Sequence, residues 1–200
     1  MKDIYSHIES HVDESIQQLF ELVRQPSISA QKVGFDKAPG LMKDLLERNG
    51  FEALIIPVPN DGLPTVCGYM AASENPETAP TLLFYCHYDV QPVDPIDLWN
   101  TDPFEPTQIG DRLYGRGMSD DKGNIGARLA AIRAFIAERG GVPCNIKMFC
   151  EGEEESGSIN LPYLIAERGD DFKADACIWE GGGRNLNGDP FMYLGLKGVL

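Results

Sequence analysis

The segment TLLFYCHYDV, residues 81–90, decides the fold that this sequence predicts. Apolar and aromatic residues fill it as far as Cys86, which is typical of a buried strand bounded by polar residues. A strand turns successive side chains to opposite faces, so His87 and Asp89 point to one side while Cys86 and Tyr88 point to the other. The run therefore predicts a strand whose C-terminal end carries an imidazole and a carboxylate together.

Segments on both sides of this run predict an alternation of helices and strands. Four segments are predicted to be helices: residues 3–24, 37–49, 123–139 and 161–168. Short β-rich runs predict four further strands, at residues 51–58, 65–71, 144–151 and 174–180. Residues 91–113 have little periodicity and are predicted to be an irregular functional loop. The alternation indicates the α/β class, with a mixed, mostly parallel sheet covered by helices on both faces.

Composition and charge exclude several classes of function. With 31 acidic and 17 basic residues, the chain offers little positive charge to neutralise the phosphates of a nucleic acid. No stretch approaches the roughly 20 apolar residues that cross a bilayer, and the start MKDIYSHIES lacks the features of a signal peptide. We therefore expect a cytoplasmic protein without membrane contact. The five cysteines form no C-x-x-C pair, which favours buried reduced thiols over disulfides or a Cys-bound zinc.

Acidic residues gather at the C-terminal ends of the predicted strands or in the loops that follow them. Four segments share this placement: CHYDV at 86–90, GRGMSDDKG at 115–123, CEGEEESGS at 150–158 and IWEGGG at 178–183. In an open α/β sheet, that edge is where ligands bind. The four segments are therefore expected to meet at one site.

Each segment alone also has an ordinary structural explanation. A single His such as His87 is often a hydrogen-bonded structural residue, and Asp120 or Asp121 would suit the N-cap of the following helix. The glutamates of EGEEESGS are equally compatible with a solvated charge run, and Glu180 with a simple loop acid. Together, however, one imidazole and several carboxylates at one edge predict an oxygen-rich site suited to zinc, cobalt or manganese.

The ordered series CHYDVQPV, WNTDPFEP, LYGRGMSDDKG and EGEEESGS resembles a known enzyme family. This is the co-catalytic zinc family of carnosinase-type dipeptidases, glutamate carboxypeptidases, aminoacylases, and the acetylornithine and succinyl-diaminopimelate deacylases. The resemblance covers residues 19–198 and implies two divalent ions, most simply zinc, in a homodimeric enzyme. Such an enzyme hydrolyses a peptide or N-acyl amide bond next to a free carboxylate. HYDVQP and DDKG favour the dipeptidase branch, whereas Glu180 is typical of the deacylase branch, so the substrate remains a dipeptide or an N-acyl amino acid.

The resemblance also implies a role for six side chains. These are His87 and Glu180 on the first metal, Asp120 bridging both metals, Glu155 on the second, Asp89 orienting His87, and Glu154 as general base. It further implies a cis peptide bond between Asp120 and Asp121.

The same resemblance gives the expected domain organisation. Residues 1–194 correspond to the N-terminal part of the catalytic domain, and residues 195–200 to the start of a lid or dimerisation domain. A second metal-binding His would lie beyond Leu200, so the 200-residue chain is expected to be inactive alone. The alternative is a metal-binding or assembly module without catalysis.

Overall fold

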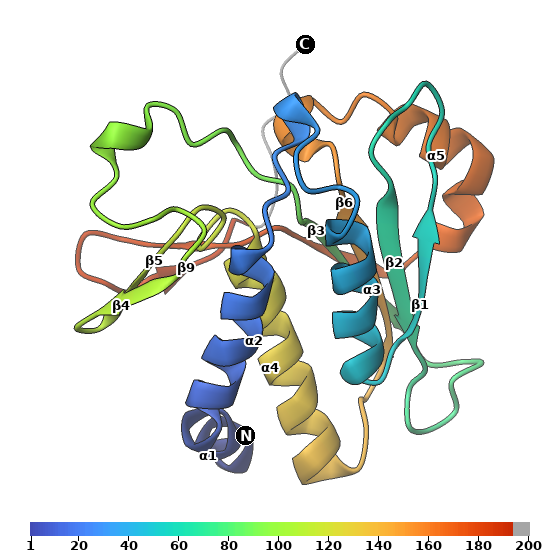
Figure 1. The fold of residues 1–200 in the computed structure, drawn as a ribbon. Coiled ribbons are helices and arrows are strands. Elements are labelled where there is room, and N and C mark those ends of the chain that lie inside the picture. Colours follow the sequence, from blue (N-terminus) through green and yellow to red (C-terminus); the bar gives the residue numbers. More distant parts are fainter. Residues whose placement is uncertain (194–200) are drawn as a thin grey trace.

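The computed structural model describes residues 1–193. The chain contains both α-helices and β-strands, as Figure 1 shows. The α-helices are α1 Lys2–Ser10, α2 Val12–Arg24, α3 Ala38–Arg48, α4 Lys122–Arg139 and α5 Leu161–Arg168. The strands are β1 Glu52–Ile56, β2 Thr65–Met70, β3 Thr81–His87, β4 Thr107–Ile109, β5 Arg112–Tyr114, β6 Asn145–Glu151, β7 Ala176–Trp179, β8 Gly183–Arg184 and β9 Pro190–Phe191. Short 3-10 helices are η1 Ser29–Gln31, η2 Ile96–Leu98, η3 Glu154–Ser156 and η4 Gly169–Phe172.

Five strands form the central sheet in the order β1-β2-β6-β3-β7. The pairs β3·β6 and β3·β7 are parallel, whereas β1·β2 and β2·β6 are antiparallel. The mixed α/β sheet that the sequence predicts is confirmed, with half of its pairs parallel because β1 and β2 form an antiparallel hairpin at one edge. The two small sheets, β4-β5 and β8-β9, lie outside it.

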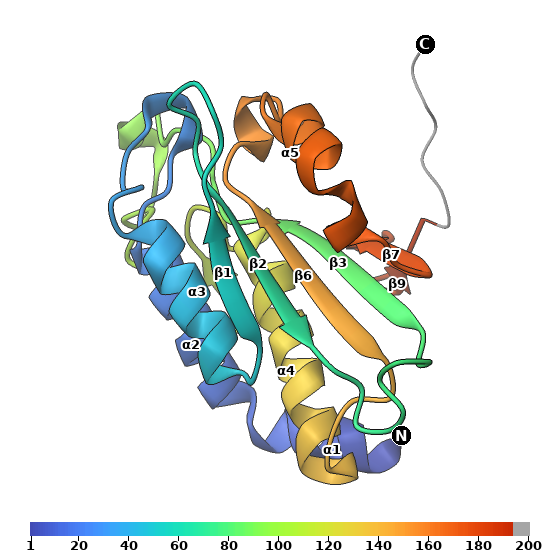
Figure 2. The same ribbon diagram turned by 90° about the vertical axis from the view of Figure 1, so that its right-hand side faces the viewer.

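Helices cover both faces of the sheet, as expected (Figure 2). On one face, buried side chains of α3 and α4 pack against β2, β3 and β6, and α2 lies against α4. On the other face, Leu164 of α5 packs with Ile56, Tyr85 and Phe149. The parallel strands β3 and β6 are therefore buried between two layers, as strands of this kind usually are.

The long helix predicted for residues 3–24 is wrong in one respect, because the structure has two helices with a break at His11. The apolar spacing continues through the break, so periodicity alone could not find it. The reason is local hydrogen bonding: the Ser10 hydroxyl and the His11 ring both bond the carbonyl of His7. Side chains that bond backbone carbonyls in this way compete with helix continuation.

The segment 91–113 was expected to contain no regular element, and this is also wrong. It holds η2, β4 and the start of β5. Strands β4 and β5 pair through a two-residue turn, Gly110-Asp111, in which Gly110 has φ +63°. A Gly-Asp turn is a common hairpin signal, but strands of three residues are too short to show periodicity.

The cysteines are free, as predicted. Cys86 and Cys150 are buried, but Cys177 is exposed, because β7 is an edge strand within the described part of the sheet. The other predicted elements agree with the structure within a few residues. The predicted boundary at 194/195 lies outside the described residues.

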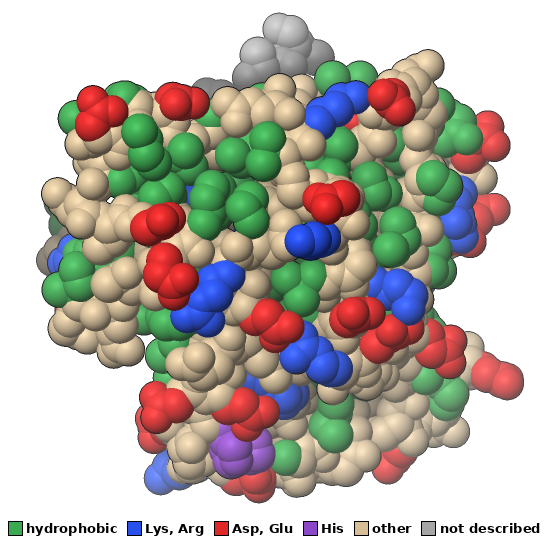
Figure 3. Space-filling model, viewed as in Figure 1, with side chains coloured by type: hydrophobic (Ala, Val, Ile, Leu, Met, Phe, Trp, Pro, Cys, Tyr) green, Lys and Arg blue, Asp and Glu red, His purple; other side chains and the backbone are tan. Residues whose placement is uncertain are grey.

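The surface in Figure 3 carries acidic and basic side chains intermixed, with no basic patch on that face. Within residues 1–193, no helix is both long and apolar enough to cross a membrane.

Leu46 lies in the core between α3 and the sheet and is 0% exposed, whereas Leu54 on β1 is 43% exposed. We expect Leu46→Ala to lower the free energy of unfolding by about 2–5 kcal/mol, because it leaves a cavity in a packed core. Leu54→Ala is the matched control and should cost less than about 1 kcal/mol. Urea denaturation measures both, and equal losses would contradict the burial of α3.

Candidate metal centre

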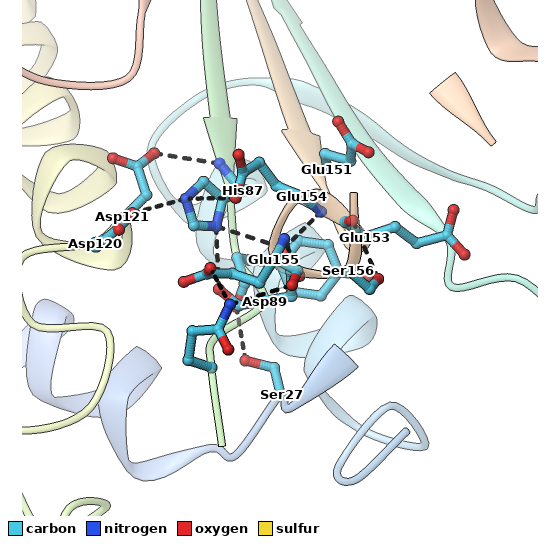
Figure 4. Close-up of polar contacts among 12 residues, drawn as sticks. Ser27, His87, Asp89, Asp120, Asp121, Glu151, Glu153, Glu154, Glu155 and Ser156 are labelled. Atoms are coloured by element: carbon cyan, nitrogen blue, oxygen red, sulfur yellow. Dashed lines mark hydrogen bonds and ion pairs between the residues drawn. The ribbon is translucent and has the colours of Figure 1, made fainter. Parts of the chain in front are cut away.

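The parallel strands bring four predicted site segments to one edge of the sheet. Strands β3, β6 and β7 run in the same direction, so His87, the turn after Glu151 and Glu180 all lie at their C-terminal ends. The N-terminus of α4 adds Asp120 and Asp121 at the same edge. Figure 4 shows Asp120, Asp121 and Glu154 close to the imidazole of His87.

His87 is 1% exposed and has carboxylates around it. Its Nε2 atom lies 2.8 Å from Asp120 Oδ1 and 3.7 Å from Glu154 Oε2. Burial alone would lower the pKa of His87, but a hydrogen bond to Asp89 and the charges of Asp89, Asp121 and Glu154 outweigh burial and raise this pKa to about 10. The imidazole therefore lies in a strongly negative environment that favours a positive charge.

Asp89 is fully buried and connects β3 to the turn after β6. His87 Nδ1 lies 3.1 Å from the Asp89 carbonyl oxygen and 3.4 Å from Asp89 Oδ1. The same carboxylate accepts the backbone N–H groups of Glu154 and Glu155, at 3.2 and 3.0 Å. As expected from the strand alternation, His87 and Asp89 face the site while Cys86 and Tyr88 lie in the opposite core.

Asp120 and Asp121 point in different directions, and the peptide bond between them is cis, as expected. The Asp120 carboxylate, 70% exposed, reaches His87 Nε2. Asp121 is buried, and its carboxylate accepts the backbone N–H of His87 at 3.2 Å and the side-chain amide of Asn124 at 2.5 Å. Asp121 occupies the N-cap position of α4 without a side-chain capping bond, so the simple N-cap explanation does not account for it.

Two sets of side chains among the described residues have ligand atoms within 4.8 Å of one another. One set is His87, Asp120 and Glu155, and the other is His87, Glu154 and Glu180. The structure thus brings together five of the six candidate residues as possible ligands. The sixth, Asp89, contacts the Nδ1 side of the His87 ring. None of the ion pairs found in residues 1–193 joins a lysine or arginine to these acids.

The sequence profile of Peptidase family M20/M25/M40 matches residues 83–191, which is more than half of the chain. The chain belongs to this family. Over 183 residues it is 34% identical to the human Beta-Ala-His dipeptidase, a match that covers 86% of this chain and 36% of that protein. It is 31% identical over 162 residues to succinyl-diaminopimelate desuccinylase of Delftia acidovorans, covering 79% of this chain and 41% of that protein.

A solved structure of an M20-family metallo-carboxypeptidase from Sulfolobus solfataricus matches with a TM-score of 0.79 and 39% identity. That match covers 88% of this chain and 39% of the other. The chain therefore spans about two fifths of the length of the family members that it matches.

The geometry differs in one detail from the ligand arrangement that family resemblance implies. The two sets of candidate ligands share His87, whereas the resemblance makes Asp120 the shared residue. One imidazole nitrogen binds one ion, so His87 cannot serve both sets at once. Glu154, the expected base, belongs to the second set, and burial followed by the charges of Glu180, Glu155 and Asp89 raises its pKa despite the opposing effect of His87.

Sequence reasoning missed two polar contacts of this site. Gln91 donates to Glu155 Oε2 at 2.7 Å and to the Glu155 carbonyl at 3.2 Å. Asn124 holds Asp121 and also lies against Gly181, where a Cβ atom would come within 2.4 Å of its side chain. The contacts of Gln91 with Glu155 and of Asn124 with Gly181 join segments distant in sequence, so no local pattern predicts them.

Asp89→Asn tests the buried connection between β3 and the turn after β6. The two oxygens of the Asp89 carboxylate now accept two backbone N–H groups. An asparagine has only one acceptor oxygen, so its NH₂ group would face one of these N–H donors. We expect a loss of about 1–3 kcal/mol in the free energy of unfolding. Asp36→Asn, at an exposed position, is the control. Denaturation curves that coincide for the two variants would contradict this role of Asp89.

Proposed function

We propose that this chain supplies the N-terminal part of the catalytic domain of a dinuclear metal-dependent hydrolase. That enzyme would cleave a peptide or N-acyl amide bond next to a free carboxylate. The observation that carries the proposal is the convergence of His87 with Asp120, Glu154, Glu155 and Glu180 at one sheet edge. Membership of the M20/M25/M40 family supports it.

The residues present fit divalent cations. Four carboxylates lie within reach of one imidazole, and among the described residues no lysine or arginine forms an ion pair with them. They therefore repel one another unless cations or protons offset their charge. Carboxylate oxygens with one His nitrogen suit zinc, and also cobalt or manganese. We assign two ions to His87, Asp120, Glu155 and Glu180, with a further His expected from residues beyond Leu200.

Each side chain has a distinct task in the proposed reaction. Bound cations would lower the pKa of a water molecule and polarise the scissile carbonyl group. Glu154 would take a proton from the attacking water and later give it to the leaving amine. Burial raises the pKa of Glu154 above its ordinary value, which makes the carboxylate a stronger proton acceptor. Asp89 would hold the His87 ring through its Nδ1 side, which leaves Nε2 directed at the metal site.

Two substrate classes fit the proposal, a dipeptide and an N-acyl amino acid. Similarity to the human Beta-Ala-His dipeptidase supports the first class, and similarity to the succinyl-diaminopimelate desuccinylase supports the second. The higher identity and longer match favour the dipeptide. We further propose that the complete enzyme is a homodimer and that the 200-residue chain alone lacks turnover.

Glu154→Gln should separate catalysis from metal binding in the complete enzyme. The amide cannot accept a proton, so we expect kcat to fall by about 10²- to 10⁴-fold. Metal content, measured by atomic emission, should stay unchanged. Glu167→Gln, on the exposed side of α5, serves as the control. Equal turnover in the Glu154 variant would refute the role of this residue, whereas no turnover in either protein would favour a metal-binding module without catalysis.

Asp120→Ala should weaken zinc binding by the 200-residue chain, because it removes the carboxylate nearest His87 Nε2. We expect the affinity to fall by at least about tenfold. Competition against a chromophoric chelator measures the dissociation constant, with Asp36→Ala as a control of equal charge change. Equal affinity in both variants would contradict the assignment of Asp120 as a ligand.

A further inference from the structure

Glu153 precedes Glu154 and Glu155 but points the other way (Figure 4). Its side chain is 6% exposed and lies on the side of the turn that faces the β1–β2 connection and the start of α5. A buried carboxylate with no cationic partner is costly unless hydrogen bonds satisfy it. None of the ion pairs among residues 1–193 includes Glu153, so its hydrogen bonds have to stabilise the charge.

Three N–H groups meet this carboxylate from two separate segments. Oε1 accepts the backbone N–H of Leu63 at 2.8 Å, and Oε2 accepts the backbone N–H of Asn160 at 3.2 Å. The Asn160 side-chain amide donates to both oxygens, at 3.1 and 2.9 Å. Asn160 is the N-cap residue of α5, so the carboxylate also lies at the positive end of a helix.

The segment opposite Glu153 is closely fitted to it. At Gly62, next to Leu63, a Cβ atom would lie 2.3 Å from Asn160 Nδ2 and 2.8 Å from Glu153 Oε1. Any larger residue at this position would push the β1–β2 connection away from the carboxylate. The antiparallel pairing of β2 with β6 brings this connection beside the C-terminal end of β6.

The turn that carries Glu154 and Glu155 is therefore held from two sides. Asp89 accepts the backbone N–H groups of Glu154 and Glu155 on the side of the site. Glu153 fixes the start of the same turn on the opposite side, and its own carbonyl accepts the N–H groups of Ser156 and Ser158. With both anchors in place, the turn has little freedom to move its two carboxylates relative to His87.

We propose that Glu153 is a positioning residue that fixes the Glu154–Glu155 turn by anchoring it to Leu63 and Asn160. This inference rests on the proposed function, since it explains how that site holds its base and one of its ligands. A carboxylate is required because both oxygens accept N–H donors, whereas a glutamine would turn its NH₂ group toward one of them.

The test compares Glu153→Gln with Glu77→Gln, an exposed control, in the 200-residue chain. Amide hydrogen exchange at residues 154 and 155 measures the freedom of the turn, and zinc titration measures the affinity of the site. We expect faster exchange at both amides and an affinity about tenfold lower in the Glu153 variant. A folded Glu153→Gln variant with unchanged exchange at these two amides would overturn the inference.

A double variant that swaps the amide and the carboxylate between positions 153 and 160 provides a second test if Glu153→Gln does not fold. In Glu153→Gln with Asn160→Asp, the glutamine NH₂ donates to the new carboxylate, which restores the contact between the two side chains, although one of the two backbone N–H groups still loses its acceptor. Exchange at residues 154 and 155 should therefore be slower than in Glu153→Gln alone. Exchange as fast as in the single variant would overturn the inference. If the parent chain binds no zinc, the proposed metal site fails, while the exchange measurements still decide whether Glu153 fixes the turn.

Discussion

Asp89 provides the contact through which the parts of this site acquire a common geometry. Its carboxylate, shielded completely from solvent, lies behind the imidazole of His87 and accepts the backbone N–H groups of Glu154 and Glu155. It thereby joins the end of β3 to the turn after β6, which places an imidazole and two carboxylates at fixed separations. Such a buried charge is tolerated because several donors satisfy it. The sheet places these residues at the C-terminal ends of its parallel strands, and Asp89 fixes the separation between His87 and the Glu154–Glu155 turn.

Electrostatic repulsion among the carboxylates of the site opposes this arrangement. Asp120, Glu154, Glu155 and Glu180 all come within reach of one imidazole, and only that imidazole pairs with them among the described ion pairs. The raised pKa values of His87 and Glu154 are two consequences of the same excess negative charge, although burial contributes most to the rise at Glu154. Divalent cations would relieve that excess and restore each group to the form that hydrolysis requires. The same mutual repulsion that lowers the stability of the metal-free cluster would favour the binding of cations.

Local patterns in the sequence predict the features that depend on local geometry. Alternation along β3 predicts that His87 and Asp89 share a side, and parallel strands predict that Glu155 and Glu180 reach the same edge. The break at His11 was missed because hydrogen bonds to one carbonyl leave no trace in the apolar period. Glu153 was indistinguishable from its neighbours in an acidic run, since its burial depends on Leu63, some 90 residues earlier. The contact of Asp120 with His87 likewise depends on the path of the intervening chain, so it was expected from family resemblance and not from spacing.

The most direct test of the metal centre is anomalous X-ray scattering at the zinc absorption edge, from crystals of this chain grown with zinc. We predict anomalous peaks beside His87 Nε2, within coordination distance of Asp120 and of Glu155 or Glu180. Zinc bound elsewhere on the molecule, with no peak at this edge under saturating concentration, would contradict the account.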